Sequence, residues 1–142
     1  MTVSVSPVMR RLTAYMAAAP HHALPAAVVE KTKHHVIDTL AAMISGTRLP
    51  PGRMAISYAI SRGGVKQACI PGTRIVTSAV NAALANGMTG HADETDDSHQ
   101  PAFYHPGCAV VPAALALAES RRASGAALLS AVALGYDVGC RV

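Results

Sequence analysis

The chain has 142 residues, of which 51% are hydrophobic and 14% charged, with a formal net charge of +4. These values are typical of one folded domain and exclude a disordered tail, and no charge-free apolar stretch reaches the ~20 residues that a membrane span needs. The basic residues are scattered with few aromatics between them, which argues against nucleic-acid binding and favours a small anionic partner. Cys69, Cys108 and Cys140 form no CxxC pair and indicate reduced thiols.

The first predicted element is an amphipathic helix near the N-terminus. Leu12, Tyr15, Met16 and Ala19 follow the i, i+3, i+4, i+7 spacing of one helical face. No acidic residue precedes Glu30, a pattern that also resembles a mitochondrial transit peptide. The reduced thiols predict a cytoplasmic protein, and this N-terminal pattern leaves the mitochondrial matrix as the alternative.

The next segments predict two further helices and a loop. One helix is expected from Pro25 to Ser45, with Gly46 just past its end. The proline pair at 50–51 is expected to end the loop that follows this helix. A short helix is then expected from Met54 to Arg62. The stretch from Val65 to Val76 contains proline and glycine, so we interpret it as a loop with room for one short extended piece.

A fourth helix is expected to begin at a cap supplied by Thr77 or Ser78. Continuing its register places His91 on the apolar face, after which the helix gives way to an acidic loop. The residues that define this face are Val80, Ala83, Leu84, Gly87 and Met88.

Two more helices complete the expected fold. The fifth begins after Pro106 and Gly107, and Pro112 is tolerable there only in or near the first turn. The sixth starts at a cap on Ser124 and is apolar nearly all round, so it expects neighbours on every side. Together the segments predict an all-α fold of about six helices in one domain, with no substantial sheet.

The segment from His91 to His105 carries the strongest chemical signal. It holds three of the seven histidines and four of the eight acidic residues. Such crowded carboxylates need a cation, hydrogen-bond donors or a raised pKa. The alternative is a solvated acidic loop. The four acidic residues are Asp93, Glu94, Asp96 and Asp97.

The histidines of this segment differ in their expected settings. His105 precedes a predicted helix start, whose partial positive charge would keep the imidazole neutral and able to accept a proton. The N–H groups beyond Gly107 would suit a substrate carboxylate. His91 could instead be a core histidine, and His99 a solvent-facing loop residue. The pairs His21–His22 and His34–His35 are interpreted as surface residues with no acidic partner nearby.

Two chemistries fit the cluster. Glu94, Asp97 and Ser98 would share one face of a final helical turn and could perform metal-free acid–base work without a cofactor. A divalent metal held by His91, Asp93, Asp97 and His99 is the other possibility. We favour the metal-free interpretation because the sequence has no ligand motif such as HExxH.

Several motifs resemble the MmgE/PrpD family, whose members include 2-methylcitrate dehydratase, cis-aconitate decarboxylase and iminodisuccinate epimerase. The matching pieces are Gly90-His91, Glu94, Asp96 to His99, His105 to Gly107, Pro112 to Glu119, Val36 to Leu40 with Gly46, and Ser124 to Arg141. The resemblance implies an all-helical main domain that is usually paired with an α/β lid in a homodimer. It also implies chemistry on citrate-like polycarboxylates without an iron–sulfur cluster.

The resemblance further implies roles for individual residues. His105 matches an acid–base histidine and Asp97 the second aspartate of a pair. Glu94 stands where the family has aspartate, and Ser98 replaces a threonine. With these four as catalytic residues, His91, His99 and Gly107 are expected to bind substrate. Glu94, Thr95 and Asp93 each depart from the family pattern, which argues against methylcitrate in particular.

Family enzymes are much longer than this chain, so we expect residues 1–142 to be the N-terminal part of the helical domain, without the lid. The first hypothesis is a hydro-lyase of the 2-methylcitrate dehydratase type, inactive as this chain alone. A decarboxylase or epimerase of the same family is an alternative. A further alternative is a non-catalytic fragment that oligomerises or pairs with another chain.

Overall fold

Six α-helices provide most of the regular structure in residues 5–141, which are the residues that the computed structural model describes. The expected all-α fold is thus confirmed, and none of these helices is long and apolar enough to cross a membrane. The helices are α1 (Pro7–Ala18), α2 (Ala26–Gly46), α3 (Pro50–Arg62), α4 (Ala79–Gly90), α5 (Pro106–Arg121) and α6 (Gly125–Gly139). The 3₁₀ turns η1 (Ala19–His21) and η2 (Gln100–Ala102) and the antiparallel strands β1 (Ala68–Cys69) and β2 (Val76–Thr77) complete the fold.

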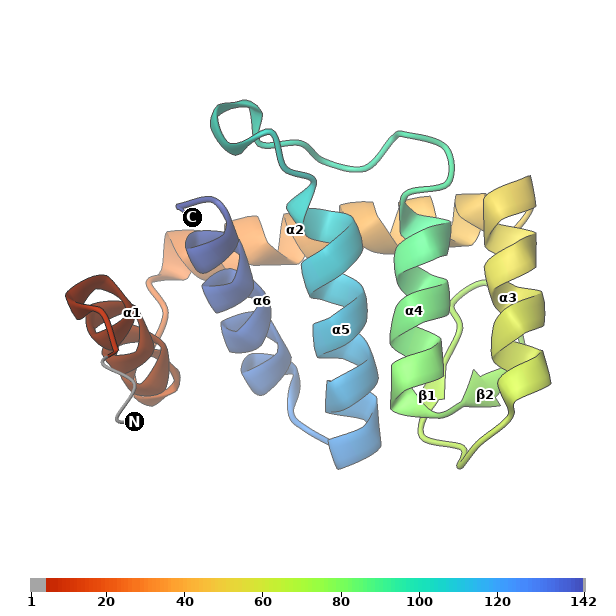
Figure 1. Ribbon diagram of the computed structural model, residues 1–142, viewed down its shortest axis with the longest axis horizontal. Helices are drawn as coiled ribbons and strands as arrows, with labels where there is room; N and C mark the ends of the chain where they lie inside the picture. Colours follow the sequence, from red (N-terminus) through yellow and green to blue (C-terminus); the bar gives the residue numbers. More distant parts are fainter. Residues whose placement is uncertain (1–4, 142) are drawn as a thin grey trace.

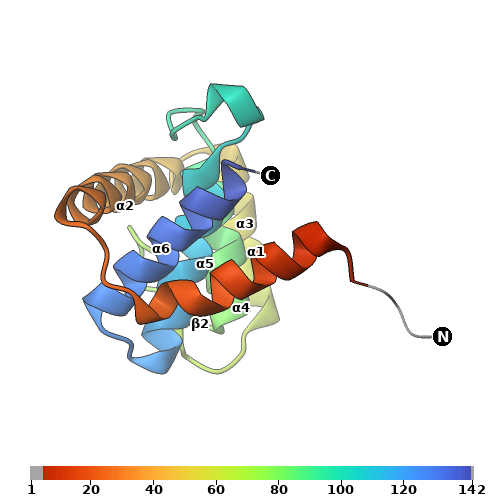
Figure 2. The same cartoon turned by 90° about the vertical axis from the view of Figure 1, so that its left-hand side faces the viewer.

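Four helices lie side by side in the order α3, α4, α5, α6, and α2 runs across them at one end (Figure 1). Helix α1 lies outside this row, beside α6 (Figure 2). The end of α4 and the start of α5 both lie where α2 crosses, and the loop 91–105 joins them there. This arrangement places the loop with the histidines over the junction of three helices.

Helix starts follow local capping chemistry. The hydroxyls of Ser6, Ser78 and Ser124 accept hydrogen bonds from backbone N–H groups three residues later. Ser78 is therefore the cap of α4, whereas Thr77 ends β2. The expected start of α3 at Met54 was wrong, because α3 begins at Pro50, where proline's fixed φ suits a first helical position.

The core consists of small clusters between helices. Met43, Val111 and Val132 meet where α2, α5 and α6 join. The other two clusters are built largely from alanine, which allows neighbouring helices to approach closely. They comprise Ala59, Ile70 and Ala85, and Ala68, Ala82 and Ala116.

Pro112 lies deeper in α5 than the sequence predicted. It occupies the second turn, six residues after Pro106, so the Cys108 carbonyl has no N–H partner four residues on. That carbonyl oxygen faces Gly87 of α4, where an added Cβ would lie only 3.0 Å away. The close packing of α4 on α5 thus accommodates the proline inside the helix.

Gly46 was expected just past the end of α2 but is its last residue. A Cβ at this position would lie 1.9 Å from the backbone oxygen of Thr89 in α4. Glycine is therefore required here by close helix contact and not by a left-handed turn.

We predict that Gly46→Ala lowers the free energy of unfolding by about 3 kcal/mol, because the facing atom is backbone and cannot swing aside. Urea denaturation followed by circular dichroism would measure this loss. Gly125→Ala is the control, since no atom from other parts of the described chain lies within 4 Å of its added Cβ, and it should leave stability unchanged or raise it by about 0.5 kcal/mol. Equal stability of wild type and Gly46→Ala would contradict the proposed contact.

Candidate active site

The loop that carries the site, residues 91–105, leaves the helical conformation directly after α4. His91 is the C-terminal cap of α4, and turns follow it. Glu94 and Phe103 have positive φ angles of 57° and 46°, which non-glycine residues seldom adopt. The expected helical turn that would gather Glu94, Asp97 and Ser98 on one face was therefore wrong.

Asp96 is the centre of one half of the site. Its side chain is 0% exposed, and its two carboxylate oxygens each lie 3.0 Å from Nδ1 of His91. Nδ1 of His105 lies 3.6 Å from Asp96 Oδ2. The two imidazole rings meet edge to face, with centroids 5.1 Å apart. The structure thus joins His91 and His105 through a buried carboxylate that the sequence analysis did not select.

Glu94 lies at the solvent-facing edge of this group. Its side chain is 75% exposed, and its Oε1 lies 3.7 Å from Nε2 of His91. His91 is therefore flanked by carboxylates on both ring nitrogens. The hydrogen bond to Asp96 is the main cause that raises the pKa of His91 above its usual value, and Glu94 adds to it.

Asp97, which follows Asp96 in the sequence, faces away from this cluster and accepts a hydrogen bond on each of its carboxylate oxygens. Its Oδ1 accepts from the Gly107 N–H at 2.8 Å, and its Oδ2 accepts from the Tyr136 hydroxyl at 2.7 Å. His35 Nδ1 of α2 lies 3.1 Å from the same Oδ2. One carboxylate therefore connects the loop with α2, α5 and α6.

The N–H of Gly107 was expected to receive a substrate carboxylate, but Asp97 already occupies that position. A Cβ on residue 107 would lie 2.6 Å from Asp97 Oδ1 and 2.7 Å from Thr39 Oγ1. Gly107 is also buried. The α5 N-terminus thus binds a carboxylate of the protein itself at this N–H.

The remaining expected site residues lie apart from the two carboxylate centres. Asp93 accepts hydrogen bonds from Ser45 and Thr95, and Ser98 is exposed. Nδ1 of His99 is buried and has no hydrogen-bond partner within the described residues, while its backbone pairs with that of Tyr104. None of the three is brought to the group around Asp96.

The metal ligand set considered from sequence is not assembled. Asp93 and Asp97 point to separate hydrogen-bond partners, and His91 reaches neither. Among the described residues, the group with metal-compatible spacing is His91, Asp96 and His105, whose donor atoms lie within 4.8 Å of one another. In this group both Asp96 oxygens are at hydrogen-bonding distance from His91, an arrangement that also serves metal-free acid–base chemistry.

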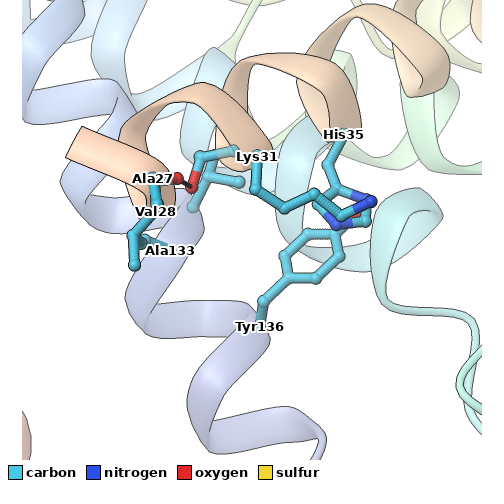
Figure 3. Close-up of a pocket in the computed structure, with 8 residues that line it drawn as sticks. Ala27, Val28, Lys31, His35, Ala133 and Tyr136 are labelled. Atoms are coloured by element: carbon cyan, nitrogen blue, oxygen red, sulfur yellow. Dashed lines mark hydrogen bonds between the residues drawn. The ribbon is translucent and has the colours of Figure 1, made fainter. Parts of the chain in front are cut away.

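His35 and Tyr136 were missed by the sequence analysis. The interpretation of His35 as lacking an acidic partner was wrong, because Asp97 reaches it from 62 positions along the chain. Figure 3 shows the rings of His35 and Tyr136 facing each other, with the Lys31 side chain extending towards them. Their centroids are 4.5 Å apart at the end of a pocket of about 290 Å³ between α2 and α6. No local pattern in the sequence signals such a contact.

The chemical state of the neighbouring thiol and phenol follows from burial. Burial, with Asp96 nearby, raises the pKa of Cys108 to about 12, so this thiol is neutral at ordinary pH. Burial and the hydrogen bond to Asp97 also raise the pKa of Tyr136. Neither side chain supplies an anionic nucleophile.

We predict that Tyr136→Phe lowers the free energy of unfolding by about 2 kcal/mol, because the nearly buried Asp97 loses a hydrogen bond. Tyr15→Phe is the matched control, since its hydroxyl also donates to an aspartate, Asp137, but at an exposed position. Urea denaturation at neutral pH should show a clear loss in the first variant and little change in the second. Equal losses would contradict a special role for the Asp97 network.

Comparison with known proteins identifies the family of this fold and site. Human cis-aconitate decarboxylase is 32% identical over 120 residues, which cover 81% of this chain and 25% of that protein. Cis-aconitate decarboxylase of Aspergillus terreus is 27% identical over 124 residues, which cover 84% of this chain and 25% of the relative. The cis-aconitate decarboxylase-like protein oryM of Aspergillus oryzae is 28% identical over 126 residues, with 84% and 26% coverage.

The chain thus spans about a quarter of the length of the curated relatives it matches. No solved structure matches it. The family model of the MmgE/PrpD N-terminal domain matches residues 10–142. The all-helical fold, the histidine–carboxylate loop and this match together show that the chain belongs to the MmgE/PrpD family.

Proposed function

We propose that this chain supplies acid–base residues to a lyase that acts on a citrate-like polycarboxylate. The observation that carries the proposal is the cluster in which buried Asp96 contacts His91 and His105 beside exposed Glu94. Proton transfer next to a carboxylate needs imidazole or carboxyl groups held at the protein surface within reach of substrate. Both imidazoles in this cluster are partly exposed.

Among the lyase reactions, we propose decarboxylation of a cis-aconitate-like substrate ahead of 2-methylcitrate dehydration. The relatives that support this choice carry the name cis-aconitate decarboxylase. Loss of carbon dioxide leaves an electron pair on the adjacent carbon, and an acid must deliver a proton to it. Dehydration or epimerisation would use the same groups to remove a proton next to a carboxylate, so these remain the alternatives.

The geometry favours different roles for the residues selected from sequence. We assign proton transfer to His105 and propose that Glu94 and Ser98, both exposed, contact substrate at the open side of the loop. The left-handed backbone at Glu94 supports a functional constraint there, because strained conformations persist where the surrounding structure enforces them. Asp97 is proposed to hold the start of α5 in place and not to transfer protons, since its oxygens are already engaged.

We predict that His105→Gln lowers turnover of cis-aconitate by about 100-fold or more while leaving the fold intact, because glutamine cannot exchange a proton. Carbon dioxide release from cis-aconitate and loss of water from 2-methylcitrate would be measured with the complete lyase to which this chain contributes. Isothermal titration with each polycarboxylate would measure binding independently of turnover. Circular dichroism would check folding.

His22→Gln is the matched control, because His22 is exposed in the linker before α2, far along the chain from the loop. It should behave as wild type in every assay. Full activity of His105→Gln would overturn the role of His105. If the protein neither binds nor turns over any of these polycarboxylates, the proposed substrate class is overturned.

A second candidate function is self-association, which an apolar groove between α3 and α4 supports. The groove has a volume of about 550 Å³, and its lining contains no charged residue, as expected at the centre of a homodimer interface. Two-fold symmetry would place the same two helices of a second copy over it. The lining residues are Pro50, Pro51, Met54, Ala55, Tyr58, Leu84 and Met88.

We predict that wild type sediments as a dimer and that the double variant Met54→Glu, Leu84→Glu sediments as a monomer, because buried glutamates would repel each other across the interface. Both positions are exposed in the single chain, so the variant should still fold. Val65→Glu is the control, since Val65 is as exposed as Met54, at 73%, but lies outside the groove. A monomeric wild type in analytical ultracentrifugation would overturn this second candidate.

A further inference from the structure

The Asp96 carboxyl group lies in a place where water cannot stabilise a negative charge. Its side chain is fully buried, and a buried carboxylate is costly unless donors compensate it. In the described part of the chain, the side chains in ion-pair contact with it are those of His91 and His105. The two imidazoles are therefore the groups that can balance a negative charge here, and the carboxylate in turn constrains them.

His91 makes the closer of the two contacts with this carboxylate. Its Nδ1 faces both oxygens of Asp96, while Glu94 lies near its other ring nitrogen. Two flanking carboxylates favour the imidazolium form of His91, in agreement with its raised pKa. Because the rings of His91 and His105 are 5.1 Å apart, a positive charge on His91 opposes a second positive charge on His105.

The position of His105 restricts where its proton can lie. Its Nδ1 is buried, has no hydrogen-bond partner within the described residues and lies 3.6 Å from Asp96 Oδ2. A lone pair on Nδ1 would face carboxylate lone pairs, which is repulsive, whereas an N–H would be attracted to them. The ring is 40% exposed although Nδ1 is buried, so its open edge is the one that carries Nε2.

The other groups that face this cluster do not change the expected position of the proton on His105. Cys108, at the start of α5, is a neutral thiol within hydrogen-bonding reach of Asp96, and its sulfur contacts the His105 carbonyl oxygen at 3.4 Å. Asp97 directs its oxygens to Gly107 and Tyr136. Glu94 is exposed and lies beside His91.

We propose that Asp96 is a positioning residue that holds neutral His105 as its Nδ1–H tautomer, so that the Nε2 lone pair faces the open side. There Nε2 takes up a proton from water and delivers it to the carbon that has lost carbon dioxide, which returns His105 to the neutral form. The separation of 3.6 Å is longer than a hydrogen bond, and contacts of this kind commonly tighten when a substrate binds. The catalytic meaning of this placement rests on the proposed lyase function. The tautomer itself does not, and it can be measured without turnover.

The test is a two-bond proton–nitrogen correlation spectrum of the ¹⁵N-labelled wild-type protein at a pH where His105 is neutral. The His105→Gln variant identifies the His105 signals by their disappearance. We expect His105 to show the Nδ1–H pattern and exposed His22 to show the Nε2–H pattern that free imidazole side chains prefer. An Nε2–H pattern for His105 in the wild type would overturn the proposal.

Asp96→Asn then tests whether Asp96 is the cause. Replacing a buried carboxylate by its amide keeps the shape but removes the charge, and in serine-protease triads this change traps the wrong histidine tautomer. We expect His105 to shift to the Nε2–H form and His91 to titrate at lower pH than in wild type. An unchanged tautomer in a folded Asp96→Asn variant would overturn the role of Asp96.

Activity separates this inference from the function on which it rests. If the wild type turns over a polycarboxylate, Asp96→Asn should lower kcat by roughly 100-fold with little change in KM, because binding groups are untouched. A wild type without activity but with the Nδ1–H tautomer would refute the lyase function and leave the positioning by Asp96 intact. An active wild type with the Nε2–H tautomer would support the lyase function and refute the positioning by Asp96.

Discussion

The geometry of the site depends on one half-buried carboxylate, that of Asp97. It accepts hydrogen bonds from the Gly107 N–H at the start of α5 and from the Tyr136 hydroxyl of α6, and His35 of α2 contacts it as well. These elements come from distant parts of the sequence, and this contact holds the loop 91–105 against them, together with the hydrogen bond that Ser45 of α2 donates to Asp93. His105 directly precedes α5, so the position of its imidazole follows from the way Asp97 anchors that helix.

Two adjacent aspartates thereby acquire different tasks from their surroundings. Asp97 accepts hydrogen bonds from a backbone N–H and a tyrosine hydroxyl, and neither donor gives up its proton at ordinary pH, which suits a structural role. Asp96 is more completely buried, with a side chain that is 0% exposed, and it contacts two imidazoles, which suits control of proton position. Neighbouring carboxylates with contrasting environments are a common way in which a site divides acid–base work. Their order in the sequence alone gives no hint of this division.

The relation to cis-aconitate decarboxylases is consistent with such a site but covers only part of those proteins. The matched relatives are about four times as long as the aligned region. A citrate-like substrate carries several carboxylates, and groups that bind them need not all lie in this segment. The proposed contribution of the chain is therefore the proton-transfer cluster, with the apolar α3–α4 groove as a surface for association.

Local chemistry in the sequence was enough to predict the all-α class and most helix starts. Serine caps at 78 and 124 and the apolar periodicity act over a few residues, so they can be recognised without the fold. The proline pair at 50–51 was misinterpreted because proline can either end a connection or begin a helix, and only packing of α3 on α4 decides between them. The same holds for Pro112, which the close approach of α4 accommodates.

For the site, the sequence by itself determined the segment and the residue types, because histidines and carboxylates concentrate between positions 91 and 105. Only the tertiary structure decided which of them meet. Helix α4 ends at Gly90, and in the loop that follows Asp96 lies buried between two histidines while Asp97 contacts Tyr136 and His35. These contacts join residues up to 62 positions apart, and a long-range pairing of this kind leaves no periodic trace in the sequence.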